Sequence, residues 1–168
     1  VTSMSAAFMD CIEFNKDISN WDTSQVTTFY GMFWGATNFN FGSEPGVSDK
    51  VINWDTSNVI KMYRTFNNAS SFNQDISDWN VSNVTDISGI FNGATSFNQD
   101  ISGWNLSNVT NFTDIVNMFN GATTFINNNP SVFYNGNFIP FRYFTDLSFN
   151  NGNIQSISAS WIDNSSNT

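Results

Sequence analysis

"FNNASSFNQDISDWN" occupies residues 66–80, and "FNGATSFNQDISGWN" occupies residues 91–105. The two stretches differ at three of their 15 positions. Repetition at a fixed period is the signature of a repeat architecture, and it takes priority over any local assignment of helices and strands. The sequence therefore predicts a protein built from similar units.

The block Phe-x-x-Ala/Cys-x-x-Phe occurs five times, with its first Phe at Phe8, Phe33, Phe66, Phe91 and Phe119, and each of units 1 to 5 starts four residues before that Phe. The first Phe recurs after 25, 33, 25 and 28 residues, so the unit is 25 residues long with insertions of 8 and 3. Insertions in repeat proteins map to loops. The longer one lies within "FNFGSEPGVSDKV" (39–51), where glycines and a proline mark a surface excursion.

A second apolar pattern follows each block. An aliphatic residue is followed three positions later by a Trp in four units: Ile18 and Trp21, Val51 and Trp54, Ile76 and Trp79, and Ile101 and Trp104. One unit cannot bury these side chains alone, but stacked units turn them into columns that fill a continuous core. We therefore expect a repeat solenoid of about five turns, with a core that includes Phe66, Phe72, Trp79, Phe91, Phe97 and Trp104.

Local patterns suggest how each turn is built. Apolar residues three apart favour short helical or 3₁₀ turns in the Phe block, and the Asp-Ile-Ser-x-Trp segment suits a short strand that pairs in parallel with its neighbours. Ser and Asn of the "TSNV" and "VSNV" runs should stack as hydrogen-bonded ladders. The period fails after residue 129, so we interpret residues 1–129 as the repeat domain and 130–168 as a cap or the start of a following module.

Composition excludes several classes of function. A net charge of −9 with five Lys plus Arg gives no basic surface for nucleic acid, and no apolar run approaches the about 20 residues of a membrane span. The chain has no His and one Cys, so a Ser-His-Asp site, a Cys-His site and an imidazole zinc site cannot form. Cys11 stands where other units have Ala, and we interpret it as a small buried residue. Because Val1 already falls inside a repeat, we expect a processed or partial product.

The acids and the Trp column each have two interpretations. Asp17, Asp75 and Asp100 share one repeat position and could gather calcium, but Lys50 stands at that position in unit 2. We favour solvated or turn-capping carboxylates and predict no metal, cofactor or catalytic residue. Stacked Trp rings could bind sugar, but large aromatic residues at one position per turn more often fill the core.

A family resemblance adds to these expectations. "AFMDCIEFNKDISNWDTSQVTTF" (7–29) and "IFNGATSFNQDISGWNLSNVTNF" (90–112) resemble the bacterial surface protein repeat of about 26 residues. That repeat is related to BspA-like leucine-rich repeats, and similar repeats occur in large DNA viruses and protists. The resemblance implies a right-handed, leucine-rich-repeat-like solenoid at a cell surface, typically serving adhesion, with no catalytic residues.

We therefore expect a non-enzymatic, extracellular or cell-surface protein that presents a rigid face to protein or glycan partners. The alternatives are a structural subunit of a virion or fibre, whose partners are neighbouring subunits, and, more weakly, a carbohydrate-active enzyme. The excursion is the candidate interaction loop, with Gly42, Ser43, Glu44, Pro45, Gly46 and Asp49. Deleting residues 42–49 should leave the fold intact and weaken recognition.

Overall fold

The computed structural model describes residues 1–111, 114 and 117–128, together with four short strands further along the chain. The chain divides into two compact units, Val1–Phe138 and Ile139–Thr168. The first holds the repeats, α2 (Thr123–Asn128), β1 (Phe133–Tyr134) and β2 (Asn137–Phe138). It extends nine residues past the expected boundary at 129, and the role of residues 130–168 as a cap stays a prediction.

The strands form two antiparallel pairs. Phe133 of β1 lies opposite Phe138 of β2. In the second unit, β3 (Asp146–Asn150) pairs with β4 (Asn153–Ser158), and a bulge between Ser148 and Phe149 shifts the register.

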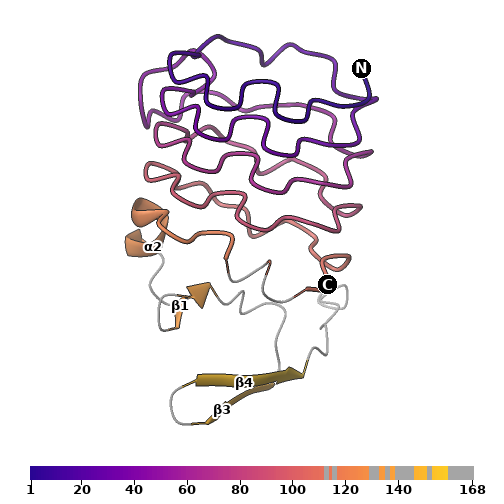
Figure 1. Ribbon diagram of the computed structural model, residues 1–168, viewed down its shortest axis with the longest axis vertical. Helices are drawn as coiled ribbons and strands as arrows, with labels where there is room; N and C mark the ends of the chain where they lie inside the picture. The colour runs from indigo at the N-terminus through magenta and orange to yellow at the C-terminus, as the bar shows by residue number, and fades with distance from the viewer. Residues whose placement is uncertain are drawn as a thin grey trace, which may run out of the picture. The chain divides into compact units, whose positions relative to one another are not determined.

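The repeats lie in successive layers along the first unit, as Figure 1 shows from indigo to magenta. Alternate backbone N–H groups of each Phe block donate to carbonyls of the following layer. Ala6 donates to Tyr30 at 2.8 Å, Phe8 to Met32 at 2.8 Å and Asp10 to Trp34 at 2.7 Å. The same rungs recur between later units, including Phe33 to Thr65, Phe66 to Ile90 and Phe91 to Met118. These inter-unit bonds satisfy backbone groups that the apolar core would otherwise leave unpaired.

In units 1 to 4 the Phe blocks are chains of turns and not helices, whereas the block of unit 5 ends in α2. Cys11 N–H bonds to the Phe8 carbonyl at 3.1 Å, and Phe14 N–H to the Cys11 carbonyl at 3.0 Å. These bonds have the expected 3₁₀ spacing, but left-handed residues four apart interrupt any helical run. They are Ala6 and Asp10 in unit 1, Gly31 and Gly35 in unit 2, Arg64 and Asn68 in unit 3, and Gly89 and Gly93 in unit 4. The N–H of each left-handed residue donates to the following layer, as Gly31 does to Tyr63, whereas the next N–H closes a local turn, as Met32 does on Phe29.

The strands expected over the Asp-Ile-Ser-x-Trp segments are absent from the described repeats, and this prediction was wrong. In unit 3 the Asp75 carboxylate accepts the Ser77 N–H at 2.9 Å, and Trp79 N–H closes a turn on the Ile76 carbonyl at 3.1 Å. The Asp side chain offers the backbone a local partner in place of a ladder. In the described repeats, parallel pairing is limited to isolated β-bridges, at Ser3–Thr28, Thr28–Lys61, Lys61–Asp86 and Val51–Asp75.

The core consists of aromatic columns. Within each unit the two Phe rings stack face to face, as Phe66 and Phe72 do at 3.9 Å between centroids. Between units the first Phe rings continue the column, with Phe66 and Phe91 6.0 Å apart. All six expected core residues are buried: Phe66, Phe72, Trp79, Phe91, Phe97 and Trp104.

Candidate interaction surface

Ladders of side chains run along the stack and occupy many of its polar groups. Asn58 donates its amide to the Ser24 carbonyl at 2.8 Å, Asn83 to Ser57 at 2.7 Å and Asn108 to Ser82 at 2.6 Å. The Asn part of the ladder expected from the sequence is thereby confirmed, whereas the Ser hydroxyls bond within their own turns, to Asp22, Asp55 and Asn80. Two further ladders were not predicted from the sequence. Thr hydroxyls donate hydrogen bonds to the carbonyls of Asp55 and Asn80. Trp indoles donate to the carbonyls of Ile18, Ile52 and Ile76.

The Trp column is core in units 2 to 4 and exposed in unit 1. Trp54, Trp79 and Trp104 are buried, as favoured from the sequence, whereas Trp21 is 42% exposed. Each buried Trp donates to a carbonyl of the preceding unit, but no unit of the described chain covers the outer side of unit 1. Cys11 is exposed for the same reason, so its interpretation as a buried residue was wrong.

The acids of the turns serve the backbone. The Asp22 carboxylate accepts the Ser24 hydroxyl at 2.7 Å, and the Asp55 carboxylate accepts the Ser57 hydroxyl at 2.6 Å. These hydroxyls, and then the backbone N–H groups of the same serines, lower the pKa of both carboxyls. Capping of this kind is what the sequence favoured. Among the described residues no three metal-ligating side chains cluster, and calcium independence stays a prediction.

Asp114 differs from the other acids. Burial, and then repulsion from Asp86, raises its pKa, while a hydrogen bond with Ser88 opposes the shift. Its chain neighbours at 112–113 and 115–116 lie outside the described residues.

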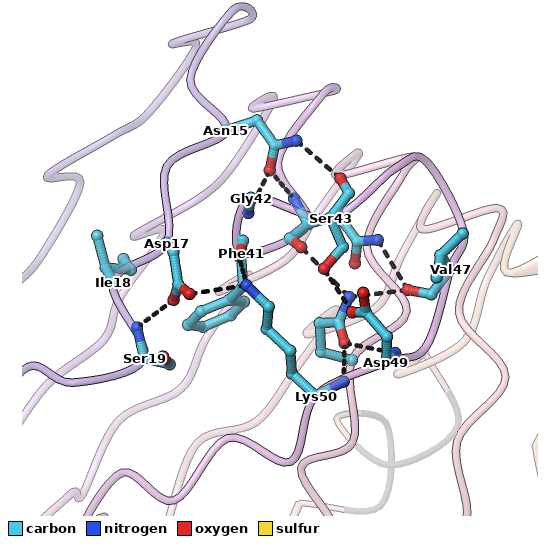
Figure 2. A network of polar contacts seen from close by, with 12 residues as sticks. Asn15, Asp17, Ile18, Ser19, Phe41, Gly42, Ser43, Val47, Asp49 and Lys50 are labelled. Carbon is cyan, nitrogen blue, oxygen red and sulfur yellow. Dashed lines mark hydrogen bonds and ion pairs between the residues drawn. The ribbon is translucent and has the colours of Figure 1, made fainter.

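The excursion of unit 2 is a loop held by amide side chains (Figure 2). The Asn15 carboxamide accepts the N–H groups of Asn40 and Gly42, both at 2.8 Å, and donates to the Ser43 carbonyl at 2.8 Å. The buried Asn40 amide donates to the carbonyls of Glu44 and Val47 at 2.6 and 2.9 Å. The loop backbone is therefore part of the stacked structure.

Unit 3 holds the other side of the loop. The Asn73 amide donates to the Gly46 carbonyl at 2.8 Å, and the Gln74 amide donates to the Val47 carbonyl at 2.7 Å. Of the six candidate interaction residues, Ser43 is buried and Gly46 half-buried, while Gly42, Glu44, Pro45 and Asp49 are exposed. Deleting residues 42–49 would remove these bonds, so the expectation that the deletion leaves the fold intact needs revision.

Lys50 ties the loop to unit 1. Its ammonium lies 2.7 Å from the Asp17 carboxylate and donates to the Phe41 carbonyl at 2.7 Å, as Figure 2 shows. The hydrogen bond from Lys50 and that from Ser19 lower the pKa of Asp17 to about 2. The sequence analysis aligned Lys50 with the Asp of the other units. In the structure Asp75 forms its β-bridge with Val51, and the Trp79 indole donates to the carbonyl of Ile52. The register of unit 2 is thus shifted by one residue, which leaves Val51 50% exposed and Ile52 fully buried.

Sequence reasoning missed a second surface feature, which we name the aromatic cluster: Tyr30, Trp34, Tyr63 and Arg64. The Tyr30 and Tyr63 rings stack at 5.3 Å between centroids. The Arg64 guanidinium lies over the Trp34 ring at 4.6 Å and over the Tyr63 ring at 4.9 Å. Tyr30 and Tyr63 each follow the apolar column residue of their unit, a signal that could have placed them at neighbouring positions.

No helix in the described part of the chain is long and apolar enough to cross a membrane. The family model described as "Mycoplasma protein of unknown function, DUF285" matches residues 1–44 and 41–156. These matches span most of the chain, which therefore belongs to this family. No curated protein and no solved structure matches the sequence.

Proposed function

We propose that this DUF285-family chain is a non-enzymatic interaction protein of a cell surface, whose stacked units form a right-handed, leucine-rich-repeat-like solenoid of the BspA type. It presents a rigid face to protein or glycan partners. The observation that carries the proposal is the set of inter-unit ladders, because they fix the backbone of each layer and repeat the same surface positions along the stack. A regular array of this kind binds by adding equivalent weak contacts.

The chemistry of the turn acids supports a non-enzymatic role. A pair of catalytic carboxyls needs two environments that separate their pKa values. Asp22 and Asp55 instead have the same partners and the same direction of pKa shift. Each also caps a turn, so each is already engaged in the fold.

Two exposed features can give specificity to the face. The loop of unit 2 presents Glu44, Pro45 and Asp49 on a backbone that Asn40 and Asn73 hold in place. The aromatic cluster presents stacked rings and a guanidinium. Both belong to the part of the stack where the repeat is least regular.

Binding of the purified chain to arrayed extracellular proteins, arrayed glycans and intact cells tests this proposal. The expected result is saturable binding to at least one surface by a monomer, with the heat-unfolded chain as the control. The principal alternative is a structural subunit of a virion or fibre. Light scattering that rises with protein concentration, together with no binding to any surface, would support that alternative and contradict ours.

A further inference from the structure

The aromatic cluster contains a cation held in an unusual place. Arg64 has φ +54°, a left-handed conformation that costs energy for a residue with a Cβ. The same position is Gly31 in unit 2 and Gly89 in unit 4, both also with positive φ. Arginine therefore occupies a position where the neighbouring units use glycine, and strain of this kind is a reason to look for a function.

The arginine stem packs beside Gly89 of the next layer. A Cβ built at Gly89 would lie in van der Waals contact with Cγ of Arg64, at 3.4 Å. From this position the guanidinium reaches the Trp34 and Tyr63 rings. Contact with the two rings restricts the orientation of the guanidinium. A ligand that binds Arg64 therefore has less side-chain conformational freedom to remove.

The guanidinium has no carboxylate partner among the described residues. The ion pair found in that part of the chain joins Lys50 to Asp17. Asp86 and Asp114 interact with Ser88, and Asp10, whose N–H donates to the Trp34 carbonyl, forms no ion pair with Arg64. In a chain with net charge −9, an arginine fixed on aromatic rings without a counterion is a site complementary to an anion.

The surroundings indicate which anion fits. Tyr30 is 39% exposed, while Trp34, Tyr63 and Arg64 are half-buried, so the cluster is a small shelf. Specific protein interfaces involve about 20 to 30 residues per partner, whereas the cluster has four. Tyrosine hydroxyls and ring edges suit a sugar unit, and the planar guanidinium suits a carboxylate.

We propose that the aromatic cluster binds a saccharide that carries a carboxylate, such as a sialic or uronic acid. Arg64 pairs with the carboxylate, and Tyr30, Trp34 and Tyr63 supply the apolar and hydroxyl contacts to the sugar. This inference rests on the proposed role in surface recognition and names the ligand class for one part of that surface.

The repeats themselves supply replacements that fit each position. Arg64→Gly introduces the residue that units 2 and 4 have at this position. Tyr30→Ser introduces the residue of units 1 and 4, and Trp34→Asn introduces the residue of units 3 and 4. Arg64→Gly also removes the left-handed strain, so the fold should be retained. Lys16→Gln, which installs the residue found at Gln74 and Gln99, is the matched control because it removes one positive charge outside the cluster.

The experiment measures binding of sialyllactose, lactose, a glucuronic acid tetrasaccharide and its carboxyl-reduced form to the folded chain by calorimetry. We expect an acidic saccharide to bind and its neutral counterpart to bind weakly. Arg64→Gly should lower the affinity for the acidic saccharide by roughly tenfold or more, because it removes a charge-assisted hydrogen-bonded pair. Lys16→Gln should leave the affinity unchanged, and Arg64→Lys should recover only part of it.

Three outcomes would overturn the inference: no binding of either acidic saccharide, equal binding by Arg64→Gly and the parent chain, or preferential binding of a hexaglutamate peptide. The arrays of the preceding section separate this failure from that of the general proposal. If the parent chain still binds a protein or a neutral glycan, surface recognition stands and the acidic ligand is wrong. If the parent chain binds nothing, both fail.

Discussion

Units 3 and 4 and the excursion of unit 2 solve the same problem of satisfying buried polar groups in different ways. In units 3 and 4, rungs such as Phe66 to Ile90 repeat at a fixed interval, and each unit templates the next. The excursion keeps backbone rungs such as that from the Gly46 N–H to the Ser71 carbonyl, and the carboxamides of Asn15, Asn40 and Asn73 add further bonds to its backbone. The comparison teaches that an insertion is accommodated here by side-chain amides that supplement the backbone ladder.

The largest effect should come from the regular part of the stack. Trp79→Ala removes a buried indole that contacts Trp54 and donates to the Ile52 carbonyl, so we expect a loss of about 3 to 5 kcal/mol of unfolding free energy. Denaturant unfolding of the purified chain measures it. Trp21→Ala is the control, because Trp21 is 42% exposed and should cost far less. Equal costs for the two variants would contradict the assignment of the column to the core.

The excursion should be sensitive to a single amide. Asn40→Ala leaves the Glu44 carbonyl and the Asn73 N–H without these partners and removes one of the two donors to the Val47 carbonyl, and we expect a loss of about 1 to 3 kcal/mol. The same measurement on Asn98→Ala provides the control, since Asn98 occupies the equivalent position in unit 4 and is exposed. If Asn40→Ala is as stable as Asn98→Ala, the loop does not depend on the amide network.

The ion pair at the base of the excursion should contribute least. Exposed ion pairs contribute about 0 to 1 kcal/mol, and the Asp17 and Lys50 side chains are both partly exposed. The folded-state pKa of Asp17 is lowered to about 2, so its contribution is present above the unfolded pKa and is lost as the pH falls toward 2.

The stability of the parent chain and of Asp17→Asn, measured from pH 7 to pH 2, tests this sign. The parent should be slightly more stable at pH 7, and the difference should disappear between about pH 4 and pH 2. A difference that grows on acidification would show that Asp17 does not gain from Lys50.

Much of the repeat part of the fold could be predicted because the apolar positions report burial directly. The spacing of Phe, Ala and Trp identified the core columns, and Phe66, Phe91 and Trp104 are buried as expected. The strand prediction failed because an Asp two residues before a Ser can cap a turn locally, and periodicity does not show which backbone partner wins. The register of unit 2 failed because the Trp was taken as the reference, whereas the ladder aligns Ile52 with Ile76.

The candidate site was less predictable than the core. Glycine and proline identified the excursion correctly as an insertion, but its hydrogen bonds connect residues up to 34 positions apart. The aromatic cluster joins Trp34 to Arg64, 30 residues further along, which no local pattern reveals. Exposure of Cys11 and Trp21 likewise depends on which layers cover unit 1 and not on their own repeat positions.

The sequence by itself determined the period, the insertions and the identity of the buried columns, because in a layer covered on both sides burial follows side-chain polarity and spacing. Only the tertiary structure decided that the blocks are turns with alternating hand, that Ile52 and not Val51 faces the core, and that Arg64 lies on rings of two units. Those features depend on hydrogen bonds and ring contacts between adjacent layers. Their energies are set by partners a full repeat away, so they exist only once the units are stacked.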